Sequence, residues 1–348
     1  MTNENNKKKA PLVKEMCENK GKKKSLKKES IEIRKALIKI FIKEFRINYA
    51  GFDWALLDDT RITPPSLETV RLEQKQIVEI GLNPILLSII CGTTFGDSHL
   101  CIPNQYKSAR LSYRHSTRQM EWFLWKTLFI FEEFFSNEDA IQFSIPDGYQ
   151  KEVQLTGCEI LGQLKASTRV NVKLTELQGI IAPNNKKTIK RSWLNHMDNY
   201  FLMTLWLDDG SLMGELGRQG FFSTGSMPID QAKILSQYFH TVWGFECRVT
   251  ELTTRPMQNG HYPTRIDLID QDNLMKLLTI IAPIIPVKSM LYKVCFFPHD
   301  VSLQQRWASD LKKLVRHEWH EELDKIYFYK KLQFYALQAR KSEEDIVQ

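Results

Sequence analysis

The sequence lacks the features that mark secreted, membrane-spanning or zinc-binding proteins. No apolar run in its 348 residues reaches the roughly 18 residues that a membrane-spanning helix needs, so we expect no membrane partner. The six cysteines include no Cys-x-x-Cys pair, which is typical of reduced thiols in a reducing compartment. The N-terminus has no apolar core for secretion and no arginine before Arg34, which makes it a poor transit peptide. We therefore expect a protein that is not secreted.

Most of the chain also lacks an excess of either charge. The formal net charge is +7, but residues 1–28 hold ten Lys and three Glu, so the remaining 320 residues carry 38 basic and 38 acidic side chains. A nucleic-acid-binding surface in this part would require charges sorted onto one face rather than an overall excess. We predict that the lysine-rich segment is a disordered arm that binds polyanions without specificity, with a purely solubilising role as the alternative.

Helical and strand-like periods recur along the chain in two successive rounds. Helical patterns cover 29–48, 117–135, 228–243, 270–281 and 303–340, and residues alternate with a strand period over 109–114, 165–174, 245–250 and 261–268. Asn83 before Pro84 predicts the start of a further helix, and Asp198 predicts another in the same way. Each half therefore follows the order helix, strands, helix, strands, helix, which indicates an internal duplication.

Two short apolar segments, Ile90–Ser98 and Leu202–Gly210, each carry an acid at the eighth position and a small residue at the ninth. A carboxylate at the end of a buried helix is unfavourable unless something neutralises it, so the pair suggests two half-sites that share cations. Gly92 and Gly96 stand four residues apart in the first segment, a spacing that lets two helices approach closely. An ordinary buried helix with glycines is the alternative.

This combination resembles the LAGLIDADG homing endonucleases, in the single-chain form that carries two copies of the motif. Residues 184–189 (Asn-Asn-Lys-Lys-Thr-Ile), 221–224 (Phe-Phe-Ser-Thr) and 286–293 (Pro-Val-Lys-Ser-Met-Leu-Tyr-Lys) are similar to segments of family members at the same places. The resemblance covers roughly Ile80 to Val294.

The resemblance implies an α+β fold with two pseudo-symmetric αββαββα-type halves. The motif helices would lie at the interface, and saddle-shaped antiparallel sheets would bind DNA. The expected segments are a disordered Lys-rich tail (1–28), an N-terminal helical extension (29–82), the first half (83–182), the second half (183–296) and a C-terminal helical extension (297–348).

The resemblance also implies which residues carry the chemistry. Asp97 and Asp209 would each bind divalent metal, Mg²⁺ or Mn²⁺, for phosphodiester hydrolysis, and Lys187 and Lys293 would lie beside the active site. Successive helical residues point about 100° apart, so Asp208 and Asp209 cannot both line the same interface, and the eighth-position match favours Asp209. Helix capping or pairing with Lys and Arg is the alternative for the acids, and Lys186 is the alternative to Lys187.

Outward polar side chains on a sheet laid in the DNA major groove can read base edges. The predicted DNA contacts are Arg110, Arg114, Lys165, Arg169, Asn171, Lys173, Arg248 and Arg265. Any sheet with one wet face shows the same alternation, so the groups are a firmer prediction than the individual residues.

The expected function is site-specific cleavage of double-stranded DNA at a long asymmetric target by a monomer, which would promote mobility of a group I intron. We expect the protein in a chloroplast or mitochondrion that encodes it, with a bacterial cytoplasm as the alternative. One rival function is an RNA maturase that assists splicing of group I intron RNA. Another is a decayed element that binds without cutting, because Thr93, Thr94 and Ser98 depart from the family consensus.

Overall fold

The computed structural model describes residues 22–51, 53–64, 76–135, 140–144, 162–213, 217–225, 227–253, 256 and 262–347. Residues 1–21, which hold most of the predicted basic arm, lie outside the described residues, and a helix begins at Lys22 within the segment predicted as disordered. None of the described helices is long and apolar enough to cross a membrane.

The first half has the order helix, two strands, helix, two strands, helix. Its elements are α6 (Pro84–Phe95), β1 (Ser98–Cys101), β2 (Arg110–Ser116), α7 (Met120–Trp125), β3 (Ile141–Ser144), β4 (Gln163–Ser167) and α8 (Val172–Ile181). Helix α7 continues into a π-helical turn, η3 (Lys126–Ile130). The four strands form an antiparallel sheet of order β1-β2-β4-β3.

The second half repeats this order. Its elements are α10 (Asn199–Asp209), β5 (Gly210–Met213), β6 (Gln219–Gly225), α11 (Ile229–Tyr238), the π-helical turn η8 (Phe239–Trp243), β7 (Cys247–Glu251), β8 (Thr264–Leu268) and α12 (Gln271–Ile281). Its sheet has the equivalent order β5-β6-β8-β7 and is also antiparallel. The predicted α+β class with two αββαββα-type halves is confirmed.

The two motif helices, α6 and α10, begin where their caps predict. The Asn83 side chain accepts a hydrogen bond from the backbone N–H of Ile85, and Pro84 occupies the first helical turn, where its missing N–H leaves no bond unmade. At α10, the Asp198 side chain accepts from the N–H of Tyr200. Asp198 also accepts from Arg61 at 2.8 Å, so the segment before the first half holds the start of the second motif helix.

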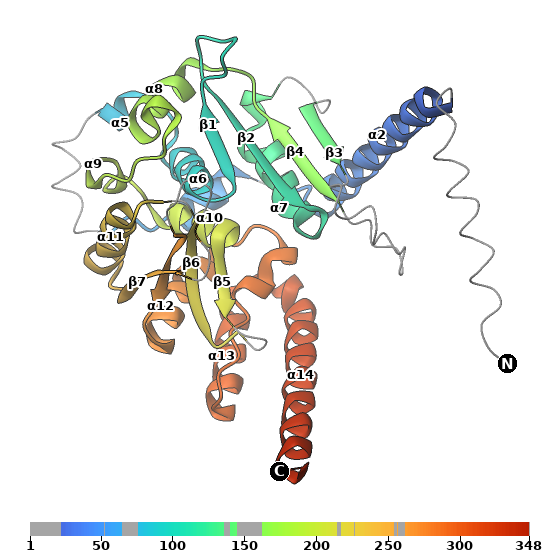
Figure 1. Cartoon of the computed structure of the whole chain (residues 1–348), viewed down its shortest axis with the longest axis vertical. Helices are drawn as coiled ribbons and strands as arrows, with labels where there is room; N and C mark the ends of the chain where they lie inside the picture. Colours follow the sequence, from blue (N-terminus) through green and yellow to red (C-terminus); the bar gives the residue numbers. More distant parts are fainter. Residues whose placement is uncertain are drawn as a thin grey trace.

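Helices α6 and α10 lie side by side between the halves and are buried on almost every side (Figure 1). Gly92 and Gly96 make the close approach possible. A Cβ at Gly92 would lie 2.8 Å from the Cβ of Thr204, and one at Gly96 would lie 2.5 Å from the Cβ of Asp208. The predicted close pairing through these glycines is therefore confirmed.

The strand predicted over 165–174 is wrong beyond Ser167, where β4 ends. Asn171 instead caps α8, since its side chain accepts from the N–H of Lys173. Leu174, Leu177 and Ile181 then recur at helical spacing and are fully buried, so helical burial prevails over the alternating pattern.

Both ends of the chain add helices. Helix α2 (Lys22–Asn48) packs on β3 and α7 through Ile38, Ile42 and Phe45, and its N-terminal part extends away from the sheets (Figure 1). Helix α14 (His320–Val347) extends in another direction. The remaining elements are α3 (Trp54–Asp59), α5 (Gln76–Glu79), α9 (Arg191–Leu194), α13 (Val301–Leu314), η2 (Thr117–Gln119), η4 (Glu132–Phe134), η7 (Pro183–Asn185), η9 (Ala282–Ile284), η10 (Lys288–Lys293) and η11 (His317–Trp319).

Candidate active site at the ends of the motif helices

The two predicted catalytic acids lie where the motif helices end. Asp97 follows Gly96, which ends α6, and Asp209 is the last residue of α10. Burial, followed by the neighbouring carboxylates of Asp97 and Asp208, raises the pKa of Asp209 to about 7. Burial and Asp208 likewise raise the pKa of Asp97 to about 6. The structure therefore brings the two acids close enough that each charged carboxylate disfavours the charge on its neighbours.

The two predicted lysines lie beside these acids in equivalent positions. Lys187 Nζ donates to the carbonyl oxygen of Gly96 at 3.3 Å, and Lys293 Nζ donates to that of Gly210 at 2.5 Å. Burial lowers the pKa of both ammonium groups, and the nearby aspartates counteract this shift. Each lysine is thus held by the glycine that follows one motif helix, with its charge near the paired acids.

Asp208 has a different environment from Asp209. Its side chain is fully buried against Gly96, at the interface between α6 and α10. Lys126 Nζ lies 2.9 Å from Oδ1, while Trp122 Nε1 donates to Oδ1 and the Thr93 hydroxyl donates to Oδ2, each at 2.6 Å. Burial alone would raise the pKa of Asp208, but Lys126 and these hydrogen bonds hold it below its usual value. Asp208 is therefore a charged carboxylate whose oxygens are already engaged.

Sequence reasoning missed two buried polar residues of the first half, Lys126 and His115. The β2 alternation, followed one step past Arg114, places His115 on the buried face beside Tyr113. His115 Nδ1 lies 3.3 Å from Asp97 Oδ2, and Nε2 lies 3.8 Å from Asp208 Oδ1. Lys126 gave no comparable signal, because it falls inside an otherwise apolar helical run.

Asp97 and Asp209 fit a divalent cation. Among the described residues, Asp209 has no hydrogen bond or ion pair, and the Asp97 side chain is 34% exposed. Two neighbouring carboxylates with raised pKa values and no strong cationic partner are a donor set that Mg²⁺ and similar ions use. Ligand atoms of Asp97, His115 and Asp208 also lie within 4.8 Å of one another, although Asp208 is occupied by Lys126.

The predicted DNA contacts of the first sheet fall into two groups. Arg110, Arg114 and Lys165 lie on the face opposite the core, with Arg114 and Lys165 directly paired across β2 and β4. Arg169, Asn171 and Lys173 follow the end of β4 and make bonds within the protein. Arg169 donates to the carbonyl of Glu133, and Lys173 donates to that of Gly81. The prediction that Arg169, Asn171 and Lys173 lie on a strand that faces DNA is therefore wrong as to the strand.

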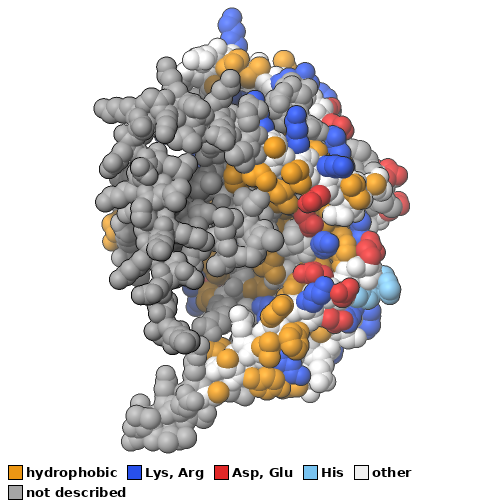
Figure 2. Space-filling view, turned by 90° about the vertical axis from the view of Figure 1, so that its right-hand side faces the viewer, with side chains coloured by type: hydrophobic (Ala, Val, Ile, Leu, Met, Phe, Trp, Pro, Cys, Tyr) orange, Lys and Arg blue, Asp and Glu red, His pale blue; other side chains and the backbone are white. Residues whose placement is uncertain are grey.

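The second sheet presents fewer basic side chains. Arg248 is exposed on β7, whereas the Arg265 guanidinium on β8 lies 2.8 Å from Asp267 and over the Phe221 ring. Basic and acidic side chains are interspersed over the described part of the face in Figure 2. This agrees with the balanced charge of the sequence outside the N-terminal segment.

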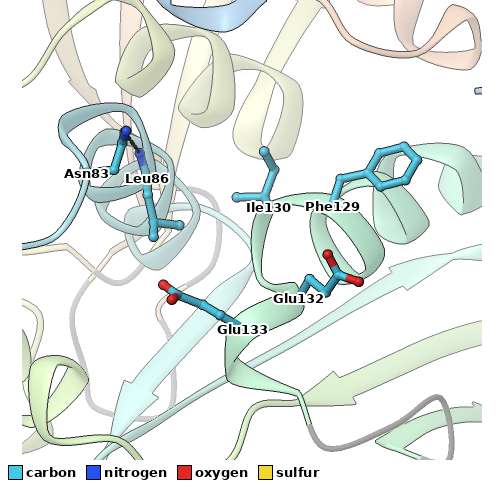
Figure 3. A pocket seen from close by; sticks show the side chains of 6 residues that line it. All are labelled: Asn83, Leu86, Phe129, Ile130, Glu132 and Glu133. Carbon is cyan, nitrogen blue, oxygen red and sulfur yellow. Dashed lines mark hydrogen bonds between the residues drawn. The ribbon is translucent and has the colours of Figure 1, made fainter. Parts of the chain in front are cut away.

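A separate cavity of about 340 Å³ lies beside the beginning of α6 (Figure 3). It is lined by Asn83, Leu86, Phe129, Ile130, Glu132 and Glu133. Asn83 and Leu86 belong to the beginning of α6, whereas Asp97 follows its end. The cavity is therefore not part of the candidate active site.

Comparisons with known proteins give a family match and structural neighbours. The sequence model of the LAGLIDADG DNA endonuclease family matches residues 87–259, which contain α10 and all of α6 except its first turn. The structure of the homing endonuclease I-WcaI bound to its DNA recognition sequence is similar, with 15% identity, a TM-score of 0.51 and coverage of 62% of this chain and 88% of that one. The structure of I-DmoI in complex with DNA and Ca gives 12% identity, a TM-score of 0.35 and coverage of 58% and 92%. No curated protein sequence matches the chain.

Proposed function

Because the chain belongs to the LAGLIDADG DNA endonuclease family, we propose that it is a metal-dependent endonuclease that cleaves both strands of a DNA duplex at a specific site. One observation carries this proposal. Asp97 and Asp209 come from different halves, lie close together at the ends of paired helices, and have raised pKa values. A pseudo-twofold pair of acids suits two phosphates on opposite strands, across the minor groove.

In this mechanism Asp97 and Asp209 would hold the divalent cations. Bound cations would supply an activated water and stabilise the leaving oxygen. Lys187 and Lys293, each held by the carbonyl oxygen of the glycine that follows one motif helix, place an ammonium group near the reacting phosphate and stabilise the charge that develops there. Asp208 takes no direct part, since Lys126, Trp122 and Thr93 already engage its oxygens.

The test is neutralisation of each acid without change of shape. We expect Asp97→Asn and Asp209→Asn to abolish double-strand cleavage while DNA affinity in Ca²⁺ is retained or increased, because a negative charge near phosphate is removed. Asp300→Asn is the matched control, because Asp300 caps the distant helix α13 and asparagine caps equally well. Full cleavage by either active-site variant would overturn the proposal.

We propose a long asymmetric target as the DNA partner. The polar faces of the two sheets differ, with Arg114 beside Lys165 on the first and Arg248 beside Asp267 on the second. Unlike half-sites read by unlike faces give a target without twofold symmetry. Cleavage by the monomeric protein at an exon junction that lacks the intron, measured with Mg²⁺ and with Mn²⁺, would test this part and the role in group I intron mobility.

A second candidate is an RNA maturase for a group I intron, with or without DNA cleavage. The observation in its favour is that α2 holds ten basic and three acidic residues, so this helix outside the family match carries a charge equal to the whole net charge of the protein. Phosphate attraction does not distinguish RNA from DNA. If the protein is a maturase, the Asp97→Asn and Asp209→Asn variants should still assist splicing. A protein that is only a nuclease would assist splicing neither as the wild type nor as these variants.

A further inference from the structure

The two half-sites differ at one position beside the acids. On β2, His115 stands two residues after Tyr113, which pairs with Ser98. On β6, Thr224 stands two residues after Phe222, which pairs with Gly210 in the same way. The residue beside Asp97 is therefore an imidazole, and its counterpart in the second half is a hydroxyl that bonds to Thr264.

His115 is fully buried and its two ring nitrogens face different groups. Nδ1 lies 3.3 Å from Asp97 Oδ2 and 3.2 Å from Gln119 Oε1. Nε2 has no hydrogen-bond partner among the described residues, and the nearest acid oxygen is Asp208 Oδ1 at 3.8 Å. A buried nitrogen without a partner is unfavourable and calls for an explanation.

The side chains around His115 form a compact group of possible ligands. Ligand atoms of Asp97, His115 and Asp208 lie within 4.8 Å of one another. An imidazole binds a metal ion through a nitrogen lone pair, and Nδ1 is the ring nitrogen that faces Asp97.

We propose that His115 is a nitrogen ligand, through Nδ1, of the cation held by Asp97, with Nε2 directed toward the Asp208 carboxylate. This inference rests on the metal-dependent function proposed above. Two ligand atoms about 2.0–2.3 Å from one ion lie roughly 2.8–4.5 Å apart, so the 3.3 Å between Nδ1 and Oδ2 is compatible with a shared ion.

The surroundings of Nε2 support this assignment. A histidine that binds metal through one nitrogen commonly donates the other N–H to a carboxylate, which fixes the ring. Here Asp208 Oδ1 is the nearest acid oxygen, 3.8 Å from Nε2, and Lys126 and Trp122 hold that carboxylate in place, so a small shift of the ring on metal binding would bring the two into hydrogen-bond distance. Without a metal, the Nδ1–H tautomer can donate to Asp97, which leaves Nε2 with the unsatisfied lone pair.

A nitrogen ligand changes metal preference. Imidazole strengthens the binding of Co²⁺ and Ni²⁺ relative to that of Mg²⁺ and Ca²⁺, which prefer oxygen. The half-site at Asp97 would therefore bind Co²⁺ more tightly than the half-site at Asp209, which has Thr224 in place of the histidine. This makes the two half-sites chemically distinct.

The experiment titrates the full chain with Co²⁺ and with Ca²⁺ by calorimetry, and records the visible absorption of bound Co²⁺. We expect His115→Ala to weaken the tighter Co²⁺ site by about tenfold or more and to change its spectrum, while Ca²⁺ affinity changes less than about threefold. His115→Gln, which fills the same space without an imidazole, should behave alike, and thermal unfolding without metal shows whether either variant folds. His99→Ala and Thr224→Ala are controls for an exposed histidine and for the second half-site.

Each outcome decides the assignment. Unchanged Co²⁺ affinity and spectrum in both folded His115 variants would overturn it, and equal losses for Co²⁺ and Ca²⁺ would make His115 a positioning residue instead. Absence of metal binding by the wild-type chain, or binding that survives Asp97→Asn together with Asp209→Asn, would also overturn the metal-dependent function. Co²⁺ binding that depends on the aspartates but is indifferent to His115 would retain the function and reject only the ligand.

Discussion

Asp208 Oδ1 and Lys126 Nζ lie 2.9 Å apart, and both side chains are fully buried. Asp208 belongs to α10 of the second half, whereas Lys126 begins the π-helical turn η3 of the first half. The pair therefore forms a charged contact across the interface, directly beneath the paired acids. The pseudo-twofold axis would relate this pair to a second one, but the residues at the corresponding positions are uncharged. Gly96 of the first half corresponds to Asp208, and Phe239, the first residue of η8, corresponds to Lys126.

Breaking this pair on one side leaves the other charge buried and uncompensated. We expect Lys126→Met or Asp208→Ala to lower the free energy of unfolding by about 3–5 kcal/mol each. The double variant should lose much less than the sum, because it leaves no buried charge. Urea unfolding of all four proteins measures the coupling, and additive losses would show that the two charges do not depend on each other.

The close approach of the motif helices gives a second prediction. Gly96→Ala places a methyl group 2.5 Å from the Cβ of Asp208, so we expect a loss of about 1–3 kcal/mol and reduced cleavage as the acids shift. Gly179→Ala is the matched control, since α8 offers its Cβ open space. That change should stabilise the protein by about 0.5–1 kcal/mol, because alanine is the better helix former. If Gly96→Ala changed neither the free energy of unfolding nor cleavage, the close contact between α6 and α10 at this position would be contradicted.

The raised pKa of Asp209 predicts how stability depends on pH in the absence of metal. In the unfolded chain this group loses its proton near its ordinary value of 3.8, but the folded chain keeps the proton up to about pH 7. Its contribution is therefore fully present below about pH 4 and is lost as the pH rises to about 7. We expect Asp209→Asn to become progressively more stable than the wild type between pH 5 and pH 8. Urea unfolding in a chelator tests this, and a constant difference across that range would contradict it.

The contact between Arg61 and Asp198 gives a fourth prediction. Asp198 is fully buried, and Arg61 is its cationic partner at 2.8 Å. We expect Arg61→Met to lower the free energy of unfolding by about 2 kcal/mol or more, because a buried carboxylate loses its charged hydrogen bond. Lys312→Met, which removes a partly exposed ion pair with Asp324, should change it by less than about 1 kcal/mol. Equal effects of both substitutions would contradict the conclusion that Arg61 holds the start of α10 through Asp198.

The sequence was sufficient for the elements that depend on local signals. Asn83 and Asp198 are caps, Gly92 and Gly96 permit the close approach, and the order of the elements in both halves follows from periodicity and resemblance. The segment from Arg169 to Lys173 was mistaken for a strand, because period-two alternation before the Asn171 cap outweighed the helical signal after it.

The partners of Asp208 could not be predicted. Lys126 contacts it across 82 positions of sequence, and nothing in the helical run around Lys126 indicates that its ammonium is buried. His115 was within reach of the alternation argument, but its relation to Asp97 depends on how the strand crosses the end of α6. The predicted roles of Lys187, Lys293 and the DNA-contacting side chains remain predictions for experiment.

The ion pair across the interface also determines which halves can associate. If two copies of residues 83–182 came together, each Lys126 would be enclosed opposite glycine, with no acid to neutralise it. If two copies of the second half did so, each Asp208 would meet phenylalanine at the corresponding place. Homodimers of either half would therefore bury two unmatched charges, and only the unlike combination is neutral. The buried ion pair therefore selects for association of one copy of each half.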